Sequence, residues 1–134
     1  MSQQTKTPTR RRFVRTFKPQ FAPAVRAGTK RQTIRPWPKR VPLPGDIIDC
    51  RMWTGRPYNS PQEKLGDHEI TEARGCTIYG DYVKVFYRDG FECLMDDSKL
   101  NEFAAADGFP DWDTMRNWFS NEHGLPFPGV LIKW

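Results

Sequence analysis

Three side chains within six residues could act together on one anionic or polar ligand. They are Lys30, Thr33 and Arg35, and they supply an ammonium, a hydroxyl and a guanidinium group. A threonine hydroxyl becomes a nucleophile only when a neighbouring base takes its proton. A lysine can be that base where burial or nearby cations lower its pKa. The alternative is that these charges are solvated on an edge strand, as most charge runs are.

A strand must hold this set, because Thr33 and Ile34 favour extended backbone. Alternation along that strand puts Arg31, Thr33 and Arg35 on one face and Gln32 and Ile34 on the other. The lysine at the mouth of the strand can turn to either face. A first strand over residues 13–17 and a short helix over residues 20–27 precede it.

The segment that follows, residues 36–44, holds four prolines and is expected to be a stiff loop. It carries Trp37 beside Lys39 and Arg40. An exposed aromatic ring can stack on a nucleobase while cations hold phosphates. The alternative for Trp37 is packing against its flanking prolines. Trp53 and Tyr58, beside a long loop predicted over residues 54–66, could form a second wall of a cleft.

The remaining pattern predicts short strands and two capped helices. Strands are expected over 47–53, over 68–78 as a pair or one bulged strand, over 82–87 and 91–95 joined by an Asp-Gly turn, and over 130–134. Helices are expected over 99–106 and 112–121. The sequence therefore predicts an α+β domain of about six or seven strands, arranged as a partly closed β-barrel with short flanking helices.

Charge is distributed unevenly along the chain. The first 45 residues hold twelve Lys and Arg and no Asp or Glu, whereas the remainder holds nine Lys and Arg and all sixteen Asp and Glu. A cationic first third favours a polyanionic partner, most simply nucleic acid. Residues 1–12 are expected to be a flexible basic leader in which Arg10, Arg11 and Arg12 bind phosphate. The alternative is an Arg-rich transit segment.

Composition argues against several other classes. The chain has 134 residues with three cysteines and two histidines, a length typical of one domain. The cysteines are widely spaced, which argues against a zinc site and fits a reducing cytoplasm. The sequence predicts no metal and no cofactor. It has no stretch apolar enough for a membrane helix and no secretory signal, so no membrane partner is expected.

Two motifs in order resemble the ASCH domain of the PUA-like superfamily, over residues 13–134. They are Lys-x-x-Thr-x-Arg at residues 30–35 and Ala-x-x-Asp-Gly-Phe at residues 104–109. The resemblance implies a PUA-like β-barrel with a cleft for RNA, a nucleotide or a modified base. Some family members are amidohydrolases that deacetylate acetylcytidine with a Lys, a Thr and a Glu. These fall on Lys30, Thr33 and Asp107, and the aspartate is one methylene shorter than glutamate.

The function expected first is therefore a module that binds RNA, other nucleic acid or a modified nucleobase. Its nucleic-acid contacts would be Arg31, Arg35, Trp37, Lys39, Arg40 and the three arginines of the leader. The alternative is an amidohydrolase acting on an acylated cytidine-type nucleoside, with Thr33 as nucleophile, Lys30 as base and Asp107 as supporting carboxylate. A weak nuclease is a third option. In a purely structural alternative, Lys30 and Asp107 form an ion pair and Arg35 holds a loop.

Overall fold

The computed structural model describes residues 10–134, so the expected leader lies outside the described residues as far as Thr9. Within this part, the chain forms eight strands and three helices in the order β1 (Arg12–Thr16), α1 (Ala22–Ala27), β2 (Gln32–Arg35), β3 (Ile47–Trp53), β4 (Gln62–Glu69), β5 (Glu72–Ile78), β6 (Val83–Tyr87), β7 (Gly90–Leu94), α2 (Asp97–Ala106), α3 (Trp112–Glu122) and β8 (Phe127–Lys133). Arg12, placed in the leader by the sequence, begins the first strand.

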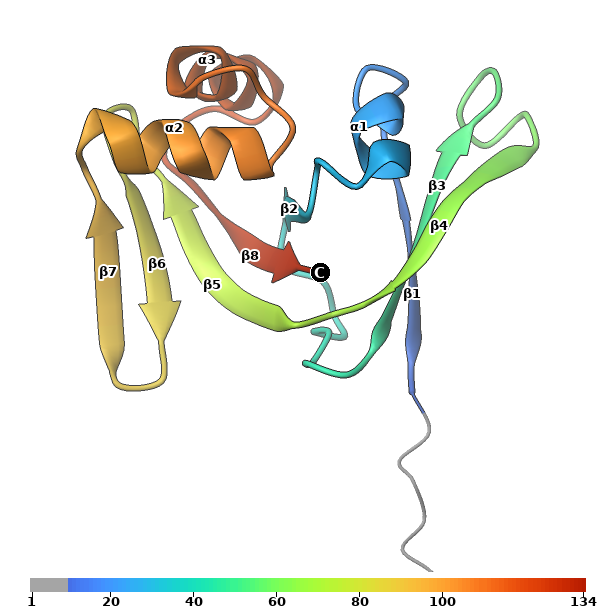
Figure 1. Ribbon diagram of the computed structural model, residues 1–134, viewed down its shortest axis with the longest axis horizontal. Coiled ribbons are helices and arrows are strands. Elements are labelled where there is room, and N and C mark those ends of the chain that lie inside the picture. The colour runs from blue at the N-terminus through green and yellow to red at the C-terminus, as the bar shows by residue number, and fades with distance from the viewer. Residues whose placement is uncertain (1–9) are drawn as a thin grey trace, which may run out of the picture.

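The strands form two sheets (Figure 1). One has the order β1-β3-β4, with β1 parallel to β3, and the other has the order β2-β8-β5-β6-β7. The predicted α+β class is confirmed. The strand count is eight rather than six or seven, and neither sheet closes on itself into a barrel.

One continuous stretch of chain joins the two sheets, since β4 and β5 are separated only by Ile70 and Thr71 (Figure 1). Ile70 is buried, and its amide donates to the carbonyl of Asp46 at 2.8 Å. The amide of Thr71 donates to the carbonyl of Lys133 in the other sheet, also at 2.8 Å. The bend therefore fixes the angle between the sheets, and the apolar core fills the space that they enclose.

Two segments differ from the sequence-based expectation. The predicted loop over 54–66 gives way to β4 from Gln62, because this polar stretch pairs with β3 from Ile47 to Trp53. Its strand is imposed by a neighbour, since no apolar alternation marks it. The last strand begins at Phe127, ahead of the predicted Val130. Pro128 is tolerated there because that part of β8 pairs only with β5.

The helices begin and end where side-chain and backbone chemistry dictates. Asp96 accepts a hydrogen bond from the amide of Lys99, and Asp111 accepts one from that of Thr114, both at 2.8 Å, so each of the two helices expected to be capped begins at an aspartate N-cap. Gly28 closes α1 in a left-handed conformation. Figure 1 shows α2 and α3 together beside the five-stranded sheet and α1 between the two sheets. No helix within residues 10–134 combines the length and apolarity needed to cross a membrane.

Candidate functional site

The two sequence motifs meet in the interior. The end of α2 lies against the start of β2, where the amide of Arg31 donates to the carbonyl of Ala106 at 3.0 Å. The Lys30 ammonium donates to the backbone carbonyl of Asp107 and lies 3.6 Å from its Oδ2. The exposed fractions of the Lys30 and Asp107 side chains are only 3% and 4%. A buried ion pair therefore ties the two motifs together.

Gly108 makes this approach feasible. Its φ is +89°, in the left-handed region, which favours glycine. A Cβ at this position would lie 3.0 Å from Cδ of Lys30, so any side chain would push against the lysine stem. The next residue, Phe109, packs edge-to-face on Phe21 with ring centroids 5.2 Å apart. The Asp-Gly-Phe sequence thus supplies a carboxylate, a gap and an apolar anchor in consecutive positions.

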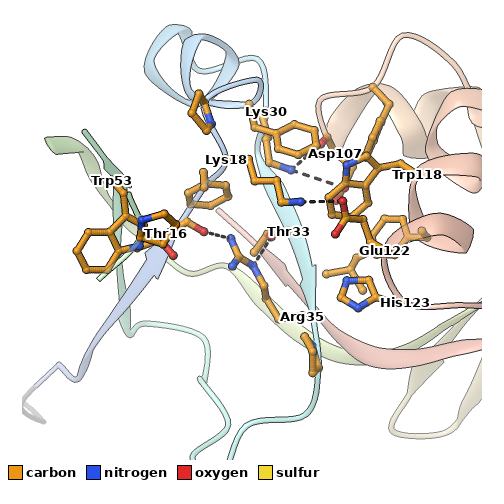
Figure 2. Close-up of a pocket in the computed structure, with 18 of the residues that line it drawn as sticks. Thr16, Lys18, Lys30, Thr33, Arg35, Trp53, Asp107, Trp118, Glu122 and His123 are labelled. Carbon is orange, nitrogen blue, oxygen red and sulfur yellow. Dashed lines mark hydrogen bonds and ion pairs between the residues drawn. The ribbon is translucent and has the colours of Figure 1, made fainter. Parts of the chain in front are cut away.

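Arg35 and Thr33 lie together on one face of β2, and this face borders a cleft that Lys30 and Asp107 also line (Figure 2). Arg35 Nε donates to Thr33 Oγ1 at 2.8 Å, and its NH2 donates to the carbonyl of Thr16 at 2.9 Å. The guanidinium carbon lies 4.7 Å from the ring centroid of Phe17. Arg31, expected on this face, instead turns outward, and its Nε donates to the carbonyl of Trp134 at 3.1 Å.

The cleft has a volume of about 480 Å³. Besides the four polar side chains just described, aromatic rings from β3, from α3 and from the connecting segments dominate its walls, including Phe17, Phe21, Trp53, Tyr58, Phe109 and Trp118. Trp53 is the last residue of β3 and Tyr58 lies in the loop that follows; their ring centroids are 5.1 Å apart, and both border the cleft as expected. Figure 2 shows Trp53 on the side opposite Trp118, with Arg35 between them.

Tyr58 at the cleft is exposed and has a positive φ of 64°. This conformation is uncommon for a residue other than glycine and costs of order 1–3 kcal/mol. This strained backbone places the ring of Tyr58 at the edge of the cleft, against Trp53. Strain of this kind is concentrated at ligand sites.

Burial dominates the protonation of the central pair. It lowers the pKa of Lys30, against the attraction of Asp107, and it raises the pKa of Asp107, against the attraction of Lys30 and the hydrogen bond from Gln32. Both shifts favour the neutral amine and the neutral acid, which brings the proton affinities of the two groups closer together. Burial also lowers the pKa of Arg35 to about 10.

The arrangement meets part of what nucleophilic catalysis requires. Arg35 donates to the oxygen of Thr33, which stabilises negative charge on that oxygen. The Lys30 ammonium is directed at Asp107, and no hydrogen bond joins it to Thr33 within residues 10–134. Lys30 must therefore turn toward Thr33 when a ligand is bound if it is to act as its base.

Most of the other predicted nucleic-acid contacts lie outside the cleft. Trp37 is exposed, and its ring lies over Gly75 of β5. Lys39 is exposed, and the Arg40 guanidinium lies 5.3 Å from the ring centroid of Phe13. These residues do not gather with Arg35 around one ligand.

The three arginines expected to bind phosphate make ion pairs within the protein. Arg10 lies 3.1 Å from Glu69, and Arg11 lies 2.9 Å from Asp46. Arg12 contacts two carboxylates, at 2.7 and 3.3 Å. Their partners are 35 or more positions away along the chain, so the sequence run alone does not reveal them.

Sequence reasoning missed the residues that α3 and the segment after β1 bring to the cleft. Lys18 pairs with Glu122 at 2.7 Å, and the Lys18 ammonium also lies 5.4 Å from the ring centroid of Trp118. His123 lines the same edge and stacks on Phe127. Trp118 and Glu122 are four residues apart on one helix, a spacing that marks a shared face. The ring of Trp118 is half-buried: it packs against the core and also borders the cleft.

All three cysteines are free, on β3, β5 and β7. Burial raises the pKa of Cys50 and of Cys76 to about 12, so neither is a reactive thiolate at neutral pH. No group of three or more His, Cys, Asp and Glu side chains in the described part of the chain is arranged to hold a metal ion. Comparison with family models, curated proteins and solved structures found no match to this chain.

Proposed function

We propose that the cleft binds a nucleobase, either free as a nucleoside or within RNA, and that the protein is a nucleic-acid or modified-nucleobase binding module. The observation that carries this proposal is the junction of aromatic walls with a small polar floor of Lys30, Thr33, Arg35 and Asp107. A base is flat, so rings can cover its faces while its edge finds donors and acceptors. Ligand sites in general combine an apolar lining with a few directed polar groups.

The ASCH resemblance supports the same proposal. The two motifs that carry it, around Lys30 and Asp107, lie in contact although 77 positions separate them. We propose on this basis that the two sheets correspond to an open PUA-like barrel, with the bend at Ile70 turning one into the other. Phosphate contacts are assigned to Arg31, Lys39 and Arg40, because none of these three pairs with an Asp or Glu side chain within residues 10–134.

Calorimetric titration with cytidine, acetylcytidine and cytidine monophosphate tests the binding site. Tyr58→Ala removes an exposed ring at the cleft, and we expect affinity to fall about 5- to 150-fold through lost stacking. Tyr87→Ala is the matched control, since Tyr87 is a partly exposed ring of β6 outside the cleft. Binding that is unchanged by Tyr58→Ala and equally unchanged by Thr33→Val would contradict the cleft as the site.

An amidohydrolase is the second candidate, favoured by the hydrogen bond from Arg35 to the Thr33 hydroxyl and by the lowered pKa of Lys30. Thr33 Oγ1 would attack the acyl carbon while Lys30 takes its proton; the amine then leaves with a proton, and water hydrolyses the acyl ester. Incubation with acetylcytidine, followed by chromatography, tests it. We expect Thr33→Ala to abolish turnover and Thr33→Ser to retain part of it. Equal turnover by Thr33→Ala and the unaltered protein would exclude Thr33 as nucleophile.

A further inference from the structure

A second aromatic surface lies on the five-stranded sheet, away from the cleft. It consists of Trp37, Phe86 and Phe91, with exposed fractions of 56%, 41% and 59%. Phe86 and Phe91 are directly opposite each other on β6 and β7, with ring centroids 6.3 Å apart. We refer to these three residues, together with Lys84, as the sheet platform. Exposed large rings gathered on one surface usually mark a binding site.

Gly75 brings Trp37 into this group. A Cβ on Gly75 would lie 3.3 Å from Cζ2 of Trp37 and 3.5 Å from Cδ2 of Phe86. Both rings therefore approach one bare stretch of β5 backbone, where any side chain would press on them. The absence of a side chain lets the indole of the proline-rich loop continue the row of rings on the sheet.

The platform also carries a cation. Lys84 shares a face of β6 with Phe86, since strand side chains alternate, and its ammonium lies 4.2 Å from the ring centroid of Phe91. Lys84 forms no ion pair with a carboxylate in the described part of the chain, whereas Lys18, Lys30 and Lys64 all do. An unneutralised ammonium beside exposed aromatic rings complements a ligand with flat bases and a phosphate backbone.

Strand register connects the platform to the cleft. Arg35 on β2 is opposite Val130 on β8, and Val130 is opposite Gly75 on β5. Cys76 pairs with Val85, so the next step of this antiparallel ladder sets Gly75 opposite Phe86, which in turn is opposite Phe91. Directly opposed residues share a face of a sheet. One row therefore runs across all five strands from the guanidinium of the cleft to the exposed rings.

We infer that the sheet platform binds single-stranded nucleic acid, stacking bases on Trp37, Phe86 and Phe91 while Lys84 contacts phosphate. The nucleic acid would continue from a base held in the cleft onto the platform, and only this continuity rests on the proposed function. The platform itself stands on its own rings and charge. The alternative occupant of an exposed apolar face is a second copy of this chain, and the test below separates the two.

Fluorescence anisotropy with a labelled single-stranded RNA of roughly ten cytidine and uridine nucleotides is the experiment, a length within the range that one such domain covers. We expect Phe91→Ala to weaken binding about 5- to 150-fold, as expected for one lost stacking contact. Lys84→Gln should reduce the slope of log affinity against log salt by about 0.7, the value for one phosphate contact on a single strand. Tyr87→Ala is the control, because Tyr87 is adjacent to Phe86, equally exposed at 43%, and on the opposite face of β6.

Cytidine monophosphate separates this inference from the proposed function. Phe91→Ala should leave mononucleotide binding unchanged, whereas Tyr58→Ala should weaken it. RNA affinity that is the same for Phe91→Ala, Lys84→Gln and the unaltered protein would overturn the platform and leave the cleft standing. A failure of the unaltered protein to bind the RNA would also overturn it. A dimer in sedimentation experiments that Phe91→Ala converts to a monomer, with RNA affinity unaffected, would assign the surface to self-association instead.

Discussion

Two aspartates in this protein are almost completely buried among cations, yet their acidities shift in opposite directions. The pKa of Asp107 is raised, chiefly by burial. The pKa of Asp49 on β3 is lowered, chiefly by hydrogen bonds from Arg51 at 2.9 and 3.0 Å. Arg12 and Lys64 add to the attraction of Asp49, at 3.3 and 4.0 Å.

The difference lies in the partners rather than in the aspartates. Arg12, Arg51 and Lys64 keep a third to a half of their side-chain surface in solvent, so charge around Asp49 is well hydrated. Lys30 is as buried as Asp107, and both charges of that pair lose hydration. A carboxylate surrounded by several hydrated cations is a structural anchor. A carboxylate paired with one dehydrated amine is a group whose proton can be moved by a ligand.

The two aspartates should differ most in how much stability is lost when one cation is removed from each. We expect Lys30→Met to lower the free energy of unfolding by about 3–5 kcal/mol, because it leaves Asp107 buried without a counter-charge. Arg51→Met should cost less, since Asp49 keeps two other cations. Urea unfolding measures both. The double variant Lys30→Met with Asp107→Leu is the control and should recover most of the loss; equal losses in the two single variants would contradict the contrast.

The pH dependence of stability in the same two variants gives a second test of the contrast between Asp107 and Asp49. In Lys30→Met, burial keeps the folded-state pKa of Asp107 above its ordinary value of 3.8, so the folded state binds the proton more tightly than the unfolded state. Stability then falls as pH rises through the folded-state pKa of Asp107. Because the variant has lost the attraction of Lys30, which lowers this pKa, its deficit relative to the unaltered protein should shrink as pH falls from 7 toward 3.8. The deficit of Arg51→Met should change less over this range, because Asp49 keeps the hydrogen bond from Arg12 and the attraction of Lys64, which both lower its pKa. Urea unfolding at each pH provides the measurement.

The smallest effect on stability is expected for a substitution of Asp67. Hydrogen bonds from Arg12 and Lys64 lower its pKa to about 2 from an ordinary 3.8, so the ionised form stabilises the fold above pH 3.8 and this contribution is lost as pH falls toward 2. Asp67→Asn should therefore be less stable than the unaltered protein at pH 6, with the gap closing below pH 4. Solvent screens this half-exposed group, and added salt should reduce the gap. A gap that widens in acid would be inconsistent with the lowered pKa.

The sequence predicted the strand that carries Thr33 and the two capped helices, because these depend on local chemistry. The strand that carries Thr33, and the N-caps Asp96 and Asp111, follow from propensity and from side chains that bond within three residues. The meeting of Lys30 with Asp107 came from family resemblance, and the structure shows their contact directly. No pattern within either motif indicates that they touch.

What could not be predicted depends on distant partners. Arg12 is one of three adjacent cations in the sequence, but its role is set by Asp49 and Asp67, which lie 37 and 55 positions away. The polar segment that becomes β4 has no apolar alternation and becomes a strand because β3 is beside it. Trp118 has helical spacing typical of core residues, and only the position of α3 makes it a wall of the cleft.

The strand that carries Thr33 and Arg35 has a single neighbour, β8, with Gln32 opposite Lys133. Every backbone contact that holds this strand in a sheet therefore closes a loop of about a hundred residues, and such closures are slow steps in folding. A ribosome must have released the chain through Lys133 before β2 can settle. We expect the cleft to be among the last parts of the molecule to become ordered, so that ligand binding can serve as a probe for the completion of folding.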